Sequence, residues 1–189
     1  MKILCVGKNY AKHAAEMGDG RPDAPIWFWK PDSAIVADGG EIRIPKDIGA
    51  VHHEVEWAVR IGPDGRPDAM TIAIDVTARD QQAAAKQAGR PWAQAKGHHT
   101  FLPLGPWVPF QPGPHRVRLR INGDVCQDGS TKDMTWSLNE LLADAATWTT
   151  LARGDVMLTG TPEGVGPLRP GDEVVADLVG HVRASWRVV

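Results

Sequence analysis

The chain has only two cysteines, Cys5 and Cys126, and they lie far apart and outside any CxxC spacing or cysteine–histidine cluster. Neither a disulfide framework nor a cysteine zinc site is therefore predicted, and both residues are expected to be reduced thiols. The sequence also lacks a run of about 18 apolar residues, which a membrane-spanning helix needs, and it lacks a cleavable signal segment. We therefore expect a cytoplasmic protein with no membrane partner.

The sequence also lacks a large excess of either positive or negative charge. Lys and Arg total 21 and Asp and Glu total 23, so the formal net charge is −2. A balance this close to neutral gives no reason to expect nucleic acid or an anionic membrane as a partner. The length of 189 residues predicts a single domain over residues 1–189. The 20 glycines and 15 prolines indicate that this domain is folded but rich in loops.

Short apolar segments separated by turn residues predict a mainly β fold of the α+β class with a few short helices. The clearest pattern is at 53–61, where apolar and mostly polar residues alternate and predict a half-buried strand. Asn122-Gly123 predicts a hairpin, and Ser137 with Glu140 forms a capping box for a helix through about Thr147. Further strands are predicted at 3–6, 26–29, 41–44, 71–76, 117–121, 124–127, 155–159, 173–178 and 182–189, and further helices at 9–17 and 79–88.

Three carboxylates are candidate metal ligands. Glu54 and Glu56 are two residues apart on the 53–61 strand and therefore face the same side, and Asp75 is near the end of an apolar strand, where an unpaired carboxylate is costly to bury. Oxygen ligands without cysteines favour Mg²⁺ or Mn²⁺. A Glu-x-Glu pair by itself is more typical of a solvated face, and the two histidines just before it leave open a site for a softer metal.

A second set of candidates could move protons or bind anions. His13 and Glu16 are three residues apart on a predicted helix, so the carboxylate could orient the imidazole while it takes a proton from water, although such a pair is more often an ordinary surface pair. Lys96 is ambiguous by itself, because most lysines are solvated. The stretch 159–166, TGTPEGVG, could present backbone N–H and hydroxyl groups to an anion, but it is neither a P-loop nor a dinucleotide fingerprint. No motif indicates a serine or cysteine hydrolase.

Several segments of the chain form one ordered set. They are CVGKNYAKHAAEMG (5–18), FWKP (28–31), HHEVEWAVRIG (52–62), DVTARDQQ (75–82), GRPWAQAKG (89–97), NGDVCQDGSTKDMTW (122–136) and GDVMLTGTPEGVGPLRPGDEV (154–174). In this order, and over nearly the whole chain, they resemble the fumarylacetoacetate hydrolase family, most closely its small acylpyruvate hydrolase and oxaloacetate decarboxylase branch. The resemblance implies a mixed β-sandwich roll around a Mg²⁺ or Mn²⁺ site, commonly in a homodimer.

The resemblance also implies a role for each matching residue. The matches are Glu54, Glu56 and Asp75 as metal ligands, His13 and Glu16 as the water-activating dyad, Lys96 as the lysine that stabilises the enolate-like oxygen, Arg79 and Gln82 beside the substrate, and Thr161 on a substrate carboxylate. The chain departs from the family pattern between Gly62 and Thr71, where it is shorter than expected.

Metal-dependent hydrolysis of a C–C bond is the leading hypothesis that follows. The substrate would be a 2,4-diketo acid of the acylpyruvate or fumarylpyruvate type, and pyruvate would be released. Oxaloacetate decarboxylation and 2-oxo acid tautomerisation or isomerisation are alternatives, because they share the metal and the enolate. A non-catalytic protein that binds a metal and a 2-oxo acid is the alternative from another class.

Overall fold

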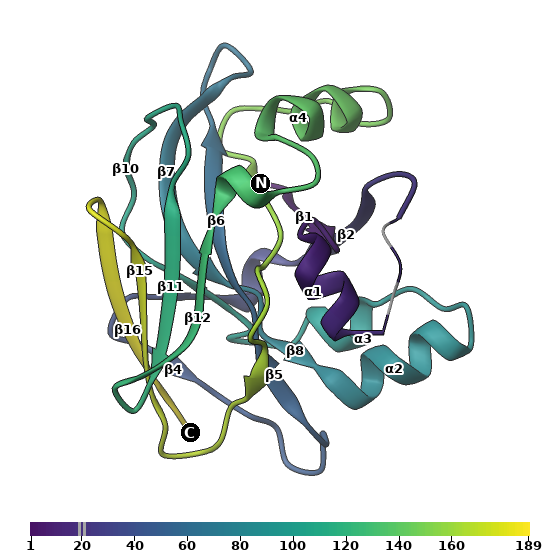
Figure 1. Ribbon diagram of the computed structural model, residues 1–189, viewed down its shortest axis with the longest axis vertical. Helices are drawn as coiled ribbons and strands as arrows, with labels where there is room; N and C mark the ends of the chain where they lie inside the picture. The colour runs from purple at the N-terminus through teal and green to yellow at the C-terminus, as the bar shows by residue number, and fades with distance from the viewer. Residues whose placement is uncertain (19, 21) are drawn as a thin grey trace.

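Three β-sheets dominate the computed structural model, which describes residues 1–18, 20 and 22–189 (Figure 1). The eight-stranded sheet has the order β2-β1-β13-β6-β7-β9-β3, with β10 also paired to β7. Its strands are β1 (Ile3–Gly7), β2 (Ile26–Lys30), β3 (Ile35–Ala37), β6 (Val55–Ile61), β7 (Pro67–Ile74), β9 (Leu102–Leu104), β10 (Val108–Pro109) and β13 (Val156–Leu158).

The two other sheets are smaller. The five-stranded sheet has the order β12-β11-β15-β16-β4 and the three-stranded sheet the order β14-β5-β8. Their strands are β4 (Glu41–Ile42), β5 (Val51–His53), β8 (Thr77–Ala78), β11 (Arg116–Ile121), β12 (Asp124–Ser130), β14 (Gly166–Pro167), β15 (Glu173–Leu178) and β16 (Val182–Val188). The predicted hairpin at Asn122-Gly123 is confirmed as the turn between β11 and β12.

The helices are short, and α1, α2 and α3 gather on one side of the sheets (Figure 1). The helical segments are α1 (Ala11–Glu16), α2 (Arg79–Gln87), α3 (Ala93–Lys96), α4 (Leu138–Ala146) and the 3-10 turns η1 (Asp32–Ala34) and η2 (Thr131–Asp133). The predicted capping box at the start of α4 is confirmed in both directions. The mainly β fold with a few short helices is therefore confirmed, and no helix in the described part of the chain is long and apolar enough to cross a bilayer.

Strand β6 is buried on both of its faces, so the prediction of a half-buried strand is wrong. Val55, Trp57 and Val59 belong to the larger core, which also takes in residues of the five-stranded sheet. Ala58, on the opposite face, packs in a second, smaller core. The alternation is real, but the second face is covered by protein and not by water.

Tertiary contacts also move the ends of two predicted elements. The helix predicted from residue 9 begins only at Ala11, because the Asn9 side chain donates to the carbonyl oxygens of Trp136 and Thr159 and so holds the chain before the helix. Strand β7 begins at Pro67, several residues earlier than predicted, because the chain turns back tightly at Gly62, whose N–H donates to Arg66 O at 2.7 Å. The shortened segment is thus a hairpin turn between β6 and β7.

Candidate metal centre and active site

The three predicted carboxylates meet at the end of the β6–β7 pair. Glu54 lies in the break between β5 and β6, Glu56 is in β6, and Asp75 follows β7 directly. The register pairs Val55 with Ile74, and Asp75 N donates to Glu54 O at 2.8 Å. One oxygen atom of each carboxylate lies within 4.8 Å of the others, and none of the three residues is more than 5% exposed.

The chemistry of this cluster fits a hard divalent cation. All its potential ligand atoms are carboxylate oxygens, which Mg²⁺ and Mn²⁺ prefer. Asp75 Oδ1 is buried and makes no hydrogen bond, although the Lys30 ammonium lies 2.9 Å from it as an ion pair. Three buried carboxylates repel one another unless positive charge joins them. Glu54, Glu56 and Asp75 could therefore hold such an ion.

Burial, reinforced by the charges of Asp75 and Glu54, raises the pKa of Glu56 well above its ordinary value. A protonated Glu56 cannot serve as an anionic ligand, so binding a cation must displace its proton. We therefore expect Mn²⁺ affinity to fall as the pH falls, and Mn²⁺ binding to release protons. Calorimetry in two buffers of different ionisation enthalpy measures that release. Proton uptake on binding, or no exchange at all, would contradict this expectation, and Glu56→Gln is the control that removes the titrating group.

Lys96 is the main counter-charge of the cluster. Its Nζ donates to Glu54 Oε2 at 2.9 Å, to Asp75 Oδ2 at 2.6 Å and to Thr77 Oγ1 at 2.7 Å. Burial opposes the charged ammonium, but Asp75 and Glu54 outweigh it and raise the pKa of Lys96. All three N–H bonds of Lys96 are thus engaged, and a contact with an enolate oxygen, which stays a prediction, would replace one of them.

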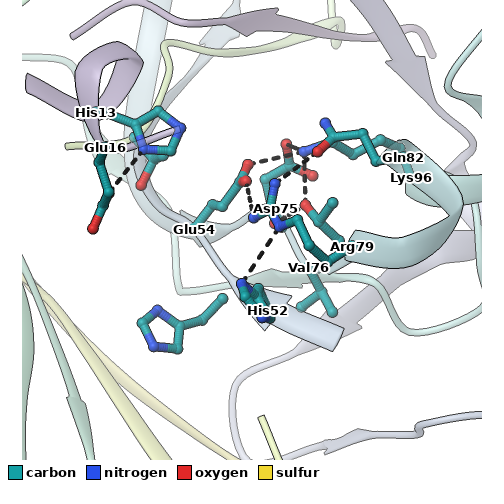
Figure 2. Close-up of polar contacts among 12 residues, drawn as sticks. His13, Glu16, His52, Glu54, Asp75, Val76, Arg79, Gln82 and Lys96 are labelled. Atoms are coloured by element: carbon teal, nitrogen blue, oxygen red, sulfur yellow. Dashed lines mark hydrogen bonds and ion pairs between the residues drawn. The ribbon is translucent and has the colours of Figure 1, made fainter. Parts of the chain in front are cut away.

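Arg79 closes the cluster from the start of α2. Its Nη2 donates to Glu54 Oε1 at 2.6 Å, its Nη1 donates to Gln82 Oε1 at 2.7 Å, and its Nε lies 3.4 Å from His52 Nδ1 (Figure 2). Burial raises the pKa of Glu54, but Lys96 and then Arg79 outweigh it, so that Glu54 ionises far more readily than an ordinary glutamate. Arg79 and Gln82 therefore lie together beside the carboxylate cluster, and their place beside a substrate stays a prediction.

Lys30 is a member of the cluster that sequence reasoning missed. Its Nζ donates to the carbonyl oxygens of Val76, Lys96 and Phe101 at 2.6–3.0 Å and lies 2.9 Å from Asp75 Oδ1. Burial lowers the pKa of Lys30, and Asp75 offsets part of that effect. The available signal was a lysine that closes an apolar, aromatic strand directly before a proline. Its partners are 45 or more residues away along the chain, so that signal does not identify them.

His13 and Glu16 form the predicted pair on α1. His13 Nδ1 lies 3.3 Å from Glu16 Oε2, and the His13 residue is 6% exposed (Figure 2). The N–H of Gly164 donates to both oxygens of the same carboxylate, at 3.1 and 3.2 Å. A carboxylate beside Nδ1 favours the proton on that atom, which leaves Nε2 as the basic nitrogen. The geometry suits a histidine that accepts or delivers a proton at Nε2.

The 159–166 stretch does present N–H groups to anions, and these anions are the protein's own carboxylates. Gly160 N donates to Glu56 Oε2 at 2.6 Å, while Gly164 N donates to Glu16. The hydroxyl of Thr161 donates to Val55 O at 2.8 Å. The contact between Thr161 and a substrate carboxylate stays a prediction, and the hydroxyl proton would have to leave Val55 O to make it.

These groups surround one small cavity of about 30 Å³. Its lining includes most of the predicted site residues together with Met17, Phe28 and Trp92, which make part of the wall apolar. A volume of this size holds one or two waters. Side chains at the cavity must therefore move apart before a ligand larger than a few atoms can enter.

Comparison with known proteins shows the family of this chain. The model of the family described as "Fumarylacetoacetate (FAA) hydrolase C-terminal" matches residues 2–189. The chain belongs to this family. A mitochondrial oxaloacetate tautomerase of Arabidopsis thaliana is 42% identical, over 99% of this chain and 90% of that protein. The oxaloacetate tautomerase YcgM of Escherichia coli K12 is also 42% identical, over 95% of this chain and 89% of that protein.

A similar solved structure supports the fold. It is a fumarylpyruvate hydrolase from Pseudomonas aeruginosa in complex with Mn²⁺ and pyruvate. Its TM-score is 0.95 at 31% identity, and the match covers 100% of this chain and 89% of that chain. The β-sandwich roll that the sequence predicted is thus confirmed.

Proposed function

We propose that the protein is a Mg²⁺- or Mn²⁺-dependent tautomerase that interconverts the enol and keto forms of oxaloacetate or a closely related 2-oxo dicarboxylic acid. The observation that carries this proposal is that two carboxylates of the buried cluster, Glu54 and Glu56, line the same cavity as His13, whose Nδ1 lies beside Glu16. The two oxaloacetate tautomerases at 42% identity favour this reaction, an alternative that the sequence allows, over C–C bond hydrolysis, the leading hypothesis from the sequence.

Ketonisation removes the proton from the enol oxygen and adds a proton at C3. The enol proton leaves to water as the enolate forms, and protonated His13 delivers its Nε2 proton to C3 while Glu16 stabilises the imidazolium through Nδ1. His13 then regains a proton from water, so no net proton is gained or lost. Lys96 and Arg79 place positive charge beside the cavity, which lowers the energy of an enolate. A divalent ion held by Glu54, Glu56 and Asp75 would supply further Lewis-acid stabilisation of that enolate.

Removal of the metal is the first test of this function. Enol-oxaloacetate is supplied to the purified protein, and loss of the ultraviolet absorbance of the enol is followed with and without Mn²⁺. We expect ketonisation above the buffer rate in the presence of the ion and a return to the buffer rate after treatment with EDTA, because Lys96 and Arg79 are paired with the carboxylates and do not replace the charge of the ion. A rate that EDTA leaves unchanged would contradict the proposal, and Mn²⁺ added back in excess is the control for chelator effects.

C–C bond hydrolysis is the second candidate, and it is favoured by the similarity to the fumarylpyruvate hydrolase from P. aeruginosa. In that reaction His13 would take a proton from water instead of delivering one to carbon. Pyruvate release from acetylpyruvate and fumarylpyruvate tests it, and pyruvate release from oxaloacetate tests decarboxylation on the same samples. Pyruvate formation faster than ketonisation would place hydrolysis or decarboxylation first.

Two further features remain proposals. The first is the homodimer, for which light scattering on the purified protein gives the mass directly. The second is a cytoplasmic location, which the sequence predicts and cell fractionation tests. A non-catalytic role as a metal and 2-oxo acid binding protein would require metal binding without turnover on any of the substrates above.

A further inference from the structure

Gln127 is a buried amide on an exposed strand. It lies in β12, at the edge of the five-stranded sheet and outside the sheet that carries Glu56. Gln127 is 1% exposed, and it is the one buried residue among the seven of β12. Burying an amide costs free energy unless its hydrogen bonds are made, so its partners show what it does there.

The side chain of Gln127 makes four hydrogen bonds, which is its full ordinary capacity. Oε1 accepts from Val55 N at 3.0 Å and lies 2.9 Å from His53 Nδ1. Nε2 donates to Thr161 Oγ1 at 2.8 Å and to Pro162 O at 2.9 Å. A backbone N–H can only donate and a carbonyl oxygen can only accept, so Val55 and Pro162 fix the orientation of the amide without ambiguity.

Gln127, Thr161 and Val55 form a closed ring of hydrogen bonds. The amide of Gln127 donates to the Thr161 hydroxyl, that hydroxyl donates to Val55 O, and Val55 N donates back to the amide oxygen. Val55 is the residue between Glu54 and Glu56, at the break where β5 ends and β6 begins. The ring therefore holds both peptide groups of the residue that separates two of the carboxylates.

The same amide holds the loop between β13 and β14, the yellow-green segment beside β12 in Figure 1. On one side of Thr161, Gly160 N donates to Glu56; on the other side of Pro162, Gly164 N donates to Glu16. The loop packs so closely on β12 that a Cβ atom on Gly129 would lie only 2.5 Å from Pro162 Cβ. Gln127 thus bonds to the middle of a loop that contacts Glu56 of the carboxylate cluster at one end and Glu16 of the His13–Glu16 pair at the other.

We propose that Gln127 is a positioning residue that fixes the Glu54–Glu56 segment and the 160–164 loop as one unit, and so sets the spacing between the metal ligands and the His13–Glu16 pair. The proposal rests on the proposed function in taking Glu54 and Glu56 as metal ligands. It assigns Gln127 no contact with the metal or the substrate. Its effect passes through Val55 on one side and through the loop on the other.

The test compares Gln127→Met with Leu119→Ala. The Met variant is close in size to Gln and makes none of the four hydrogen bonds. Leu119 faces Gln127 across the β11–β12 pair and belongs to the core, but it does not line the cavity. We expect Gln127→Met to weaken Mn²⁺ binding about 10- to 100-fold in calorimetry, as loss of an outer-shell partner does. We also expect faster hydrogen–deuterium exchange over residues 159–166, and a kcat that falls more than KM rises.

Leu119→Ala separates positioning from stability. It should lower the melting temperature at least as much as Gln127→Met, because a cavity in a core is costly, yet leave Mn²⁺ affinity and loop exchange within about twofold of wild type. The proposal is overturned if Gln127→Met keeps both values within that range, or if Leu119→Ala reproduces its effects.

A second variant covers the case in which Gln127→Met does not fold. Gln127→Glu keeps the acceptor for Val55 N and loses the donors to the loop, so it should speed loop exchange while weakening Mn²⁺ binding less than the Met variant. Unchanged loop exchange in Gln127→Glu overturns the proposal. Wild-type protein that binds Mn²⁺ without catalysing ketonisation contradicts the proposed function alone, because affinity and exchange are measured without turnover.

Discussion

Replacing Lys96 with Met is expected to lower the free energy of unfolding of the metal-free protein by about 3–5 kcal/mol, the usual cost of removing one partner from a buried ion pair. Lys96 is 1% exposed and bonds to Glu54 and Asp75, so its loss leaves two buried carboxylates without their main counter-charge. For a chain of this length, each 1 kcal/mol corresponds to about 2–4 °C in melting temperature. We therefore expect a fall of roughly 6–20 °C by differential scanning calorimetry with EDTA present.

Added Mn²⁺ should restore part of the stability lost in Lys96→Met. With the ammonium gone, the carboxylates face less competing positive charge, so the ion should raise the melting temperature more in the variant than in the wild type. Ketonisation should still be slow, because the positive charge of Lys96 beside the cavity is missing.

Lys12→Met is the matched control for Lys96→Met. The Lys12 side chain is 82% exposed and lies 3.4 Å from Glu163, so the pair is worth little in water. We expect a change within about 0.5 kcal/mol. Equal stability of the two variants would show that Lys96 does not hold the carboxylate cluster together.

The sequence could reveal the carboxylate cluster because its residues carry chemistry that is unusual for their local pattern. Asp75 ends an apolar strand, and Glu54 and Glu56 keep a spacing of two residues through a break that the alternation did not show. The register of β6 on β7 then brings the three together. Local pattern therefore located the three carboxylates, but the Glu-x-Glu spacing by itself favoured a solvated face, and only the resemblance to the family joined them into one metal site.

Lys30 and Gln127 could not be found in the same way. The hydrogen-bond partners of Lys30 are 46, 66 and 71 residues away along the chain, and Gln127 bonds from one sheet to a strand break and a loop near another. The burial of the second face of β6 could not be predicted either. Alternation shows that the strand has two different faces but does not show whether water or protein covers the second one. Contacts of this range are decided by tertiary packing, which a local pattern does not contain.

Replacing His13 with Gln is expected to lower the kcat for ketonisation about 10²- to 10⁴-fold, the usual contribution of a positioned general acid or base. Glutamine is close in size to histidine and polar, but it cannot accept or deliver a proton near neutral pH. The candidate metal ligands are the three carboxylates and do not include His13, so the Mn²⁺ affinity of His13→Gln should stay within about twofold of wild type in calorimetry. Glu16→Gln keeps the imidazole and loses only its charge-stabilising partner, so its kcat should fall less, by about 10- to 100-fold.

His99→Gln is the matched control for His13→Gln, since His99 is exposed, bonds to Ser33 O and does not line the cavity. Its kcat should equal that of the wild type. Full turnover in His13→Gln would show that His13 transfers no proton in the reaction. Catalysis would then rest only on stabilisation of the enolate by positive charge. If His13→Gln lost Mn²⁺ binding together with activity, the fall in kcat would instead reflect a damaged metal site. A loss of turnover with intact Mn²⁺ binding is therefore the result that places proton transfer on α1 and separates it from the carboxylates of β6 and β7.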